Sequence, residues 1–334
     1  MSSGYTDRDT IAVLNDRYNL VKKIGKGATS SVYLGYDSKE KSNELFAFKI
    51  LKHDNDNNNN TTSFEENKIF QNEASILSNI SHPNIVTLYE SSTNASLKKT
   101  NGKSKTISFI RTEYLEFGDL FDYVYYPKKG FGENLSRLLM NSIISGIEHI
   151  HNAGYVHRDL KTENIMMNSS FNVKIVDFGF ATKIEGINKN GKHMQYLGTP
   201  VYAAPELHFK VPYNGIANDI FSLGVIMFVL VTGCLPFRMD IPNDQFYCCI
   251  VKGDYEMFWK KQHFKLSESF MQLFNNMIAF DPIQRPSIAE IKESEWLREG
   301  NYSIDNYYNL RKECIKRHSI IQKKKAMKNS INKN

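Results

Sequence analysis

The chain has 334 residues, of which 41% are hydrophobic and 23% charged, enough apolar material for a large core. Its longest apolar run, residues 223–231, is far shorter than the ~20 residues of a membrane-spanning helix, so it predicts a buried helix. The four cysteines lack metal-binding or disulfide spacing, and the first ten residues hold no apolar core of a secretory signal. We therefore expect a cytoplasmic protein that can also enter the nucleus.

The net charge of +6 is unevenly distributed along the chain. In residues 311–334, nine Lys or Arg residues and one acid give +8, which leaves −2 for the other residues. A nearly neutral body lacks the basic surface that nucleic-acid binding requires. We therefore expect no nucleic acid partner, and we assign the basicity to the C-terminal tail.

The first part of the chain is rich in β-forming residues. Residues 18–24, 31–36 and 45–51 are short β-rich segments separated by polar or glycine-containing turns, which predicts three strands. Residues 53–63 contain a run of asparagines and have low complexity. We interpret them as a disordered insertion without a catalytic role.

A helix is predicted next, at residues 64–79. Within it, Ile69, Glu73, Ile76 and Leu77 recur at the spacing that places them on one side of a helix. Residues 93–106 predict a second polar insertion between two strand-like segments. From residue 135 onward the pattern becomes mostly helical, which indicates a larger helical second part.

A glycine-rich turn lies between the first two predicted strands. Gly25 and Gly27 lack a Cβ atom, so the backbone there can approach phosphate groups closely. Two glycines within eight residues also fit an ordinary turn. Taken alone, this turn is therefore a weak signal for phosphate binding.

One charged residue interrupts the third predicted strand. Lys49 lies in the apolar segment Phe46-Ala47-Phe48-Lys49-Ile50, where a lysine is costly unless it has a partner and a role. The simpler alternative is a solvent-facing lysine on an edge strand. Glu73, on the largely apolar predicted helix, is the candidate partner, and a Lys49–Glu73 pair would hold the ammonium group for phosphate binding.

The strongest signal is the stretch His157-Arg158-Asp159-Leu160-Lys161-Thr162-Glu163-Asn164. Asp177-Phe178-Gly179 follows it, directly after a Val-Lys-Ile-Val strand. Composition alone does not produce this combination of residues at these offsets. Together with the glycine-rich turn and Lys49, these motifs resemble the serine/threonine branch of the eukaryotic protein kinase family over residues 18–296. The sequence of residues 113–124 is similar to that of the calmodulin-dependent/SNF1-like group of this family.

The resemblance implies an α+β, bilobal protein kinase fold. A small β-rich N-lobe with one main helix would occupy residues 18–112, and a larger helical C-lobe would occupy residues 116–297. The kinase domain would then span residues 18–297. Residues 1–17 would form an N-terminal extension and residues 298–334 a basic tail.

The resemblance also implies the catalytic roles and the cofactors, ATP and Mg²⁺. Asp159 would accept the proton of the substrate hydroxyl, and Lys161 would neutralise charge on the transferred phosphoryl group. Asn164 and Asp177 would supply the oxygen ligands that Mg²⁺ prefers. Lys49 would hold the α- and β-phosphates.

The remaining implied residues form the nucleotide site. Ser30 stands where the family has its third loop glycine, a departure that bears on ATP affinity. Glu113 and Leu115 would present hinge backbone groups to adenine. The full set of implied nucleotide-binding residues is Ile24, Gly25, Gly27, Val32, Ala47, Lys49, Glu73, Glu113, Leu115, Asp119, Met166 and Asp177.

The resemblance extends to the substrate and to activation. Lys161 and Thr199 are typical of serine/threonine kinases, so protein Ser/Thr hydroxyls in signalling would be the substrates. Asp119 and Glu163 stand where basophilic members hold substrate arginine, which predicts a preference for basic residues near the target. Residues 184–197 contain no Ser or Thr, and Gln195 occupies the usual phosphothreonine position. We expect activity without Ser/Thr phosphorylation of this segment, which leaves Tyr196 and Thr182 as the alternative sites.

Two structural contacts are implied as well. Glu206 of Ala204-Pro205-Glu206 would pair with Arg285, and Asp219 would anchor the catalytic loop. Two other functions remain as alternatives, a non-catalytic pseudokinase scaffold and a small-molecule kinase of related fold. The first normally lacks one of the four main catalytic residues, and the second fits poorly with the protein-substrate segment at residues 198–206.

The basic tail leaves two alternatives open. Leu310, Cys314, Ile315, Ile320, Ile321 and Met327 alternate there with lysines and arginines. A basic amphipathic helix of this kind suits calmodulin or an acidic membrane surface. The alternative is a solvated, partly disordered terminus, and residues 329–334 are expected to be disordered. We expect the protein to be a monomer.

Overall fold

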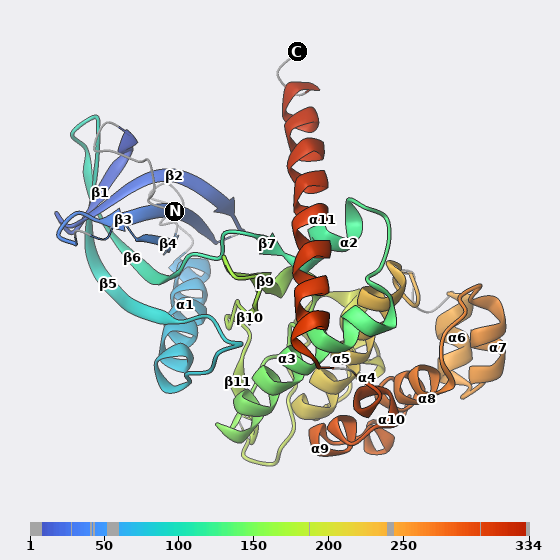
Figure 1. The fold of residues 1–334 in the computed structure, drawn as a ribbon. Helices are drawn as coiled ribbons and strands as arrows, with labels where there is room; N and C mark the ends of the chain where they lie inside the picture. The colour runs from blue at the N-terminus through green and yellow to red at the C-terminus, as the bar shows by residue number, and fades with distance from the viewer. Residues whose placement is uncertain are drawn as a thin grey trace. The chain divides into compact units, whose positions relative to one another are not determined.

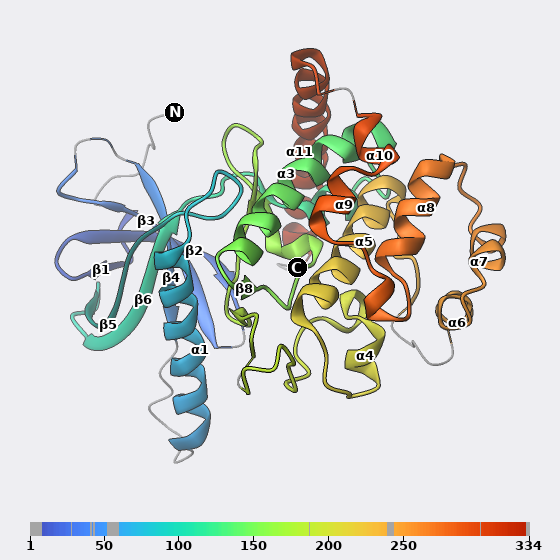
Figure 2. The same cartoon turned by 90° about the horizontal axis from the view of Figure 1, so that it is seen from below.

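The computed structural model describes residues 9–27, 29–40, 42, 44–51, 60–186, 188–238, 244–300 and 302–331. The chain divides into two compact units, one ending at Glu116 and the other beginning at Phe117. The first unit is β-rich with one long helix, and the second is mainly helical (Figures 1 and 2). This composition confirms the predicted α+β fold class.

The sheet of the first unit closes into an antiparallel barrel with the strand order β1-β2-β3-β4-β6-β5. The six strands are β1 (Ala12–Leu14), β2 (Tyr18–Lys26), β3 (Ser30–Asp37), β4 (Leu45–Leu51), β5 (Leu88–Lys99) and β6 (Ser104–Glu113). The sequence did not predict β1, which pairs with β2 on one side and β5 on the other. A three-residue strand carries too little periodicity to be recognised, yet it closes the barrel.

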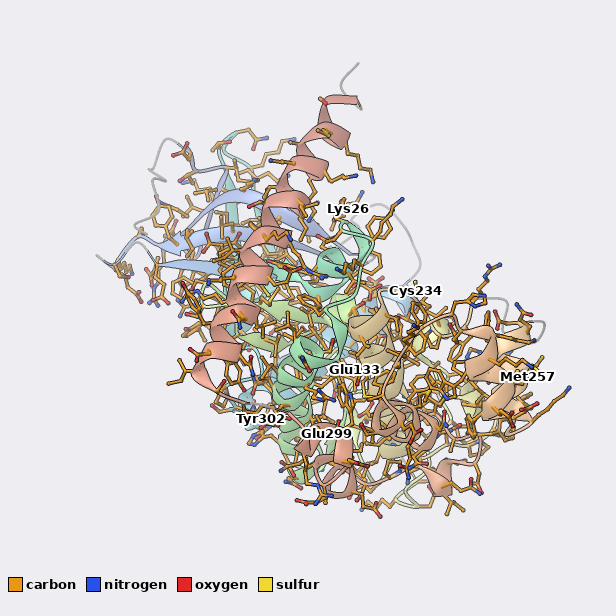
Figure 3. The ribbon with its side chains drawn as sticks, turned by 45° about the vertical axis from the view of Figure 1, so that its right-hand side comes forward. Lys26, Glu133, Cys234, Met257, Glu299 and Tyr302 are labelled. Atoms are coloured by element: carbon orange, nitrogen blue, oxygen red, sulfur yellow. The ribbon has the colours of Figure 1, made fainter. Side chains whose placement is uncertain are left out.

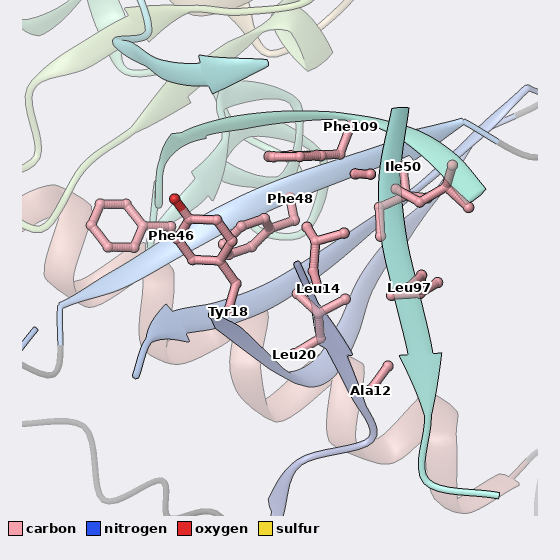
Figure 4. Packing of buried hydrophobic residues seen from close by; sticks show 11 residues of the cluster. Ala12, Leu14, Tyr18, Leu20, Phe46, Phe48, Ile50, Leu97 and Phe109 are labelled. Carbon is pink, nitrogen blue, oxygen red and sulfur yellow. The ribbon is translucent and has the colours of Figure 1, made fainter. Parts of the chain in front are cut away.

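Aromatic side chains fill the barrel (Figure 4). Tyr18, Phe48 and Phe109 are fully buried, and the Tyr18 ring centroid lies 5.2 Å from that of Phe48 and 6.3 Å from that of Phe109. Leu14 of β1 is also fully buried in this cluster. The inward-facing residues of β4 are therefore Phe46, Phe48 and Ile50, so the alternate positions of that strand face outward.

The helix α1 (Asn60–Asn79) covers the predicted helical segment and begins four residues earlier. Glu73, Ile76 and Leu77 are buried as expected, but Ile69 is 39% exposed, and Phe70 is buried instead. The predicted insertion at residues 53–63 is wrong for its last four residues, whose backbone is helical. Its earlier residues, 53–59, lie outside the described part of the chain.

The second predicted insertion, at residues 93–106, is also wrong. Most of this segment belongs to a β-hairpin formed by β5 and β6, whose paired residues include Ala95 with Ile107 and Lys98 with Ser104. Gly102 forms its turn at a φ of +80°, a conformation that favours glycine. The polar residues are the solvent-facing positions of two long strands, and Ala95, Leu97 and Ile107 alternate with them inward.

The second unit has a helical framework with short strands. Figure 2 shows α3 and α5 side by side at its centre, in agreement with their direct contact. Its elements are β7 (Gly118–Asp119), α2 (Leu120–Tyr125), α3 (Gly132–Asn152), β8 (Tyr155–Val156), η2 (Thr162–Asn164), β9 (Ile165–Met167), β10 (Val173–Ile175), β11 (Thr182–Lys183), η3 (Pro200–Tyr202), α4 (Pro205–His208), α5 (Gly215–Thr232), α6 (Gln245–Val251), α7 (Tyr255–Lys261), α8 (Glu268–Met277), η5 (Pro282–Gln284), α9 (Ile288–Lys292), α10 (Glu295–Arg298) and α11 (Ile304–Ile331).

The central helix α5 contains the longest apolar run of the sequence. Asn214 caps its first turn by accepting from the Ala217 amide, and Gly233 ends it at a φ of +85°. In the described part of the chain, α5 is the one helix long and apolar enough to cross a membrane, and 83% of it is buried inside the protein. The prediction of a buried helix is confirmed.

A partly buried polar network joins the start of α3 to α10 (Figure 3). Glu133 accepts hydrogen bonds from Trp296 Nε1 at 2.9 Å and from the Ser267 amide at 2.9 Å. Arg137, one turn later, donates to the Trp296 carbonyl at 2.7 Å and to Glu299 at 2.8 Å. Residues far apart in sequence are thereby tied into one unit.

The tail forms the helix α11, which packs against α2 and α3. Its residues Leu310, Cys314 and Ile321 are buried, whereas Ile315 is 49% exposed and Met327 62% exposed. The alternative of a solvated, disordered terminus is therefore wrong for residues 304–331. The expected disorder of 329–334 is contradicted for residues 329–331, and residues 332–334 lie outside the described part.

A buried arginine fixes α11 to the second unit. Arg317 is 3% exposed and donates to the carbonyl oxygens of Tyr123 at 2.8 Å, Lys129 at 2.7 Å and Gly130 at 2.7 Å. Its guanidinium carbon lies 3.9 Å from the centroid of the Phe131 ring. These carbonyls lie at the end of α2 and in the loop that follows, so the guanidinium group satisfies backbone acceptors of both.

Candidate active site

The loop after β8 is held by one buried carboxylate, as predicted. Asp219 of α5 accepts from the amides of His157 and Arg158, each at 2.9 Å, and from His151 Nε2 at 2.9 Å. Burial acts to raise the pKa of Asp219, but the hydrogen bond and charge of His151 together hold it below its ordinary value. The carboxylate therefore stays charged, and it fixes the two residues that precede Asp159.

Asp159 lies at the centre of a compact hydrogen-bond group. Its Oδ2 accepts from Lys161 Nζ at 2.7 Å, and its Oδ1 accepts from Thr199 Oγ1 at 3.0 Å. Lys161 Nζ also donates to Thr199 Oγ1 at 2.8 Å. Asp159 is 6% exposed, so these contacts orient a nearly buried carboxylate. A carboxylate beside an ammonium group can accept a proton while the cation compensates negative charge at a nearby phosphoryl group.

The close approach of Thr199 to Asp159 depends on Gly198. This glycine has a φ of +108°, and a Cβ atom there would lie 2.8 Å from the Arg158 carbonyl oxygen. Any other residue would push the Thr199 segment away from Asp159. The Gly198-Thr199 pair, which the sequence offered only as a mark of the serine/threonine branch, is therefore part of the site itself.

Asn164 and Asp177 provide hard oxygen ligands near Asp159. Asn164 Nδ2 donates to the Asp159 carbonyl at 2.9 Å and to Asp159 Oδ2 at 3.1 Å, so its amide oxygen is the end that a cation can use. The Val176 amide donates to the Asn164 carbonyl at 2.9 Å and connects the two ligand positions along the chain. Asp177 is exposed and has a φ of +62°, a conformation that aspartate tolerates.

This donor set fits Mg²⁺ better than a transition metal. The described residues contain no group of three or more His, Cys, Asp or Glu side chains that could hold a metal alone. Mg²⁺ is commonly bound by one or two carboxylates together with phosphate oxygens and water, so it does not need such a group. Asn164 and Asp177 therefore suit a cation that arrives with a polyphosphate.

The predicted Lys49–Glu73 pair is present in the first unit. Lys49 Nζ of β4 lies 2.6 Å from Glu73 Oε2 of α1, and Glu73 is 5% exposed. The strand register pairs Lys49 of β4 with Val32 of β3, and Val32 in turn pairs with Gly25 of β2. Because Lys49 faces outward from the barrel, the ion pair lies on its outer surface rather than in its aromatic core.

The other predicted nucleotide-binding residues of the first unit lie along the same strands. Ile24 is 39% exposed, and Ala47 pairs with Thr112 of β6. In the glycine-rich turn the Gly27 amide donates to the Ser30 carbonyl at 2.9 Å, and Ser30 is buried in β3. The serine at position 30 therefore does not prevent the hydrogen bond between Gly27 and Ser30. Ala28 lies outside the described residues.

The end of β6 carries the predicted hinge residues. Glu113 Oε1 accepts from the Thr87 amide at 2.8 Å, and the Glu113 amide donates to the Thr87 carbonyl at 3.1 Å. Leu115 is buried. The contact with Thr87 holds the end of β6 and therefore fixes the backbone that precedes Leu115.

Asp119 and Met166, in the second unit, are paired across β7 and β9. Asp119 also caps α2 by accepting from the Asp122 amide at 3.0 Å. Burial raises the pKa of Asp119 to about 6, and the nearby Lys325 opposes this shift. The sequence did not predict Lys325, which forms an ion pair with Asp122 next to this site. Contact between the tail and α2 carries no local sequence signal.

The predicted Glu206–Arg285 ion pair is confirmed. Arg285 Nη1 and Nη2 lie 2.7 and 2.8 Å from the two carboxylate oxygens of Glu206, and the Arg285 side chain is 1% exposed. Arg285 also donates to the carbonyl of Ala279 at 2.9 Å and stacks over Phe221 at 5.1 Å. This bidentate pair ties the end of the 177–206 segment to the helical framework.

A protein family model and several curated proteins match most of this chain. The family model described as protein kinase domain matches residues 18–297. CBL-interacting protein kinase 26 of Oryza sativa subsp. japonica is 33% identical over 88% of this chain and 54% of its own length. CBL-interacting serine/threonine-protein kinase 17 of Arabidopsis thaliana is 32% identical over 87% of this chain and 62% of its own length.

A third relative comes from a different organism. The probable serine/threonine-protein kinase MARK-A of Dictyostelium discoideum is 32% identical over 84% of this chain and 24% of its own length. The chain thus spans between about a quarter and three fifths of the length of these curated relatives. Because the family model covers most of the chain, and includes the Asp159 and Lys49 groups, the chain belongs to the protein kinase family.

Proposed function

We propose that this protein is a serine/threonine protein kinase that transfers the γ-phosphoryl group of ATP to protein hydroxyl groups. The observation that carries the proposal is the hydrogen-bonded group of Asp159, Lys161 and Thr199, in which a nearly buried carboxylate is oriented by an ammonium group and a hydroxyl. The names of the relatives, which are serine/threonine kinases, support the same reaction class.

In this mechanism Asp159 Oδ accepts the proton of the substrate hydroxyl as that oxygen bonds to phosphorus. Lys161 compensates the negative charge of the phosphoryl oxygens. Thr199 holds both groups, so the reacting atoms are positioned rather than covalently activated. ADP leaves with the remaining two phosphates, and no covalent intermediate with the protein is required.

The cofactors in this proposal are ATP and Mg²⁺. Asn164 and Asp177 would hold Mg²⁺, which supplies charge neutralisation of the phosphate oxygens when it is bound. Lys49, kept in place by Glu73 at 2.6 Å, would bind the α- and β-phosphates. Ile24, Val32, Ala47, Glu113, Leu115, Asp119 and Met166 would line the nucleoside part of the site.

The substrate preference follows from the acids around the site. Glu163 lies in η2 directly after the catalytic Lys161, and Asp119 is near enough for the Glu163 charge to raise its pKa. Two carboxylates at one place attract a cationic side chain. We propose that the protein prefers substrates with Arg or Lys near the phosphorylated residue. A peptide array in which every position is indifferent to basic residues would contradict this preference.

The tail has a separate proposed role as a contact surface. Its apolar side chains Leu310, Cys314 and Ile321 are buried, so calmodulin could bind them only after α11 leaves the second unit. Lys312, Lys316 and Lys323 lie on the opposite, exposed side of the helix. This arrangement supports an acidic membrane surface as the contact of the docked helix. We also propose a cytoplasmic monomer.

One experiment tests the proposed reaction class. The full chain is incubated with ATP labelled in the γ-phosphate, Mg²⁺ and an Arg-containing peptide that carries one serine. We expect labelled phosphoserine and ADP in equal amounts, and no label when EDTA removes the metal. ATP binding without transfer to this peptide or to a mixture of protein substrates would instead indicate a non-catalytic scaffold.

A further inference from the structure

The segment between β11 and Thr199, here called the activation segment, is attached to the loop before α5 by a short main-chain bridge. The His193 amide donates to the Tyr213 carbonyl at 2.8 Å, and the Tyr213 amide donates to the His193 carbonyl at 3.0 Å. The Tyr213 hydroxyl donates to the Gln195 carbonyl at 3.0 Å. Two of these contacts join backbone atoms and the third uses the Tyr213 hydroxyl, so the segment is attached to the loop before α5 without a Ser or Thr side chain.

The His193 imidazole is buried and closely packed against its neighbours. It is 4% exposed, and its ring centroid lies 5.6 Å from that of Tyr213. A Cβ atom on Gly215 would lie 3.0 Å from His193 Nε2 and 2.7 Å from Val156 Cγ2. The first residue of α5 therefore has to be small, because the imidazole and Val156 fill the space beside it.

His193 Nε2 has no hydrogen-bond partner among the described residues. A proton on this atom would place a cation in a buried position without an acceptor. The charged and titratable groups that face the ring are Arg158 of the catalytic loop, Asp219 of α5 and Tyr213. The Asp219 carboxylate is already shared among His151 and two backbone amides, so it compensates only weakly.

Burial, and then the charge of Arg158, lower the pKa of His193, against smaller opposite effects of the Ile184 backbone and Asp219. The neutral imidazole is therefore the form that the folded segment accommodates. Its stabilising contribution is fully present above the ordinary pKa of about 6.5 and is lost as the pH falls below that value. Arg158 itself donates to the Phe180 carbonyl at 2.7 Å, at the start of the same segment.

We propose that His193 and Tyr213 are positioning residues that hold the activation segment in its ordered conformation without a phosphate, and that protonation of His193 releases the segment. This inference rests on the proposed kinase function, because it assigns how the segment next to Thr199 is held. It predicts an enzyme that needs no upstream kinase and loses protein-substrate binding on acidification. Neither Gln195 nor another residue of the segment has to be modified.

The first test is a pH profile of the phosphatase-treated full chain with a serine peptide. We expect the peptide KM of the natural chain to rise as the pH falls from 7.5 to 6.0. In His193→Gln, which carries no titrating group, that rise should be smaller by about threefold or more. His263→Gln, a change at an exposed histidine, should keep the natural profile. Superimposable profiles for the natural chain and His193→Gln would overturn the proposal, as would loss of activity on phosphatase treatment.

A second variant keeps the test meaningful if His193→Gln does not fold. Tyr213→Phe retains the ring beside His193 and removes the hydroxyl, which donates to Gln195 and also interacts with Arg158. We expect the peptide KM to rise by about threefold to tenfold, with the ATP KM unchanged. Equal effects on both KM values, or none on either, would contradict a role in positioning the protein substrate.

Hydrogen exchange separates this inference from the proposed function. The His193 and Tyr213 amides both donate in the bridge, so their protection factors should fall by about tenfold between pH 7.5 and 5.5 in the natural chain but not in His193→Gln. If the natural chain transfers no phosphate and this difference is still found, the proposed function is contradicted but the release of the segment by His193 protonation is supported. If phosphate transfer is robust and the protection factors are independent of pH, only the proposed release of the segment by His193 protonation is contradicted.

Discussion

Thr199 Oγ1 donates a hydrogen bond to Asp159 Oδ1 at 3.0 Å, and Lys161 contacts both side chains. This relationship couples the proposed base to the segment at which the protein substrate would bind. In Thr199→Val both hydrogen bonds are lost, and we expect kcat to fall by about tenfold or more, since each bond involves a charged group. Thr199→Ser keeps the hydroxyl and should retain most of the activity. Steady-state kinetics that found Val and Ser variants equal would contradict this role.

The Glu206–Arg285 pair should dominate the stability of the second unit. Arg285→Ala leaves Glu206 buried without its partner, and we expect a loss of ~3–5 kcal/mol in the free energy of unfolding. The exposed pair of Lys292 with Glu148 is the matched control, and Lys292→Ala should cost less than ~1 kcal/mol. Denaturant titration of both variants gives the comparison. Similar losses in the two variants would contradict the expectation that burial makes the Glu206–Arg285 pair more important for stability than an exposed pair.

Both pairs of charged residues, Lys49–Glu73 and Glu206–Arg285, were predicted from the sequence, as was the role of Asp219. The Lys49–Glu73 pair followed from a lysine in an apolar strand, where an unpaired charge is costly. The Glu206–Arg285 pair and the role of Asp219 were implied by the resemblance to the protein kinase family. The strand β1 and the hairpin at residues 93–106 were not predicted, because three residues carry no period and the polar face of a long hairpin resembles a loop. The docked face of α11 depends on contacts between Arg317 and carbonyls 187 to 194 residues earlier in the chain, which no local pattern reveals.

Arg317 should hold α11 on the second unit. Arg317→Ala leaves the carbonyl oxygens of Tyr123, Lys129 and Gly130 without their donor, and we expect protease cleavage within residues 304–331 to accelerate by about tenfold or more. Lys316→Ala, one residue earlier and 73% exposed, is the control and should leave the cleavage rate unchanged. Unaltered cleavage in Arg317→Ala would mean that Leu310, Cys314 and Ile321 are sufficient for docking.

The raised pKa of Asp119 predicts how the stability of the folded protein depends on pH. Its pKa is raised to about 6 by burial, so the folded protein favours the protonated carboxyl and loses stability as the pH rises from about 4 through 6. Asp119→Asn keeps the cap on α2 and removes the charge, so we expect it to stabilise the nucleotide-free protein at pH 7.5 but not at pH 4. Asp254→Asn, at the exposed cap of α7, should show no such difference. Thermal unfolding at the two pH values checks the sign, and equal effects at both would contradict it.

The central claim is that Asp159 is the base of a phosphoryl transfer to serine or threonine. The most direct measurement is the rate of transfer from Mg·ATP to a serine peptide by the natural chain and by Asp159→Asn. Asp305→Asn, at an exposed position on α11, is the control. We predict that Asp159→Asn transfers at least about 10²-fold more slowly while still binding Mg·ATP, and that Asp305→Asn is unchanged. Equal rates for the natural chain and Asp159→Asn would contradict the assignment of the base and the account of the site built on it.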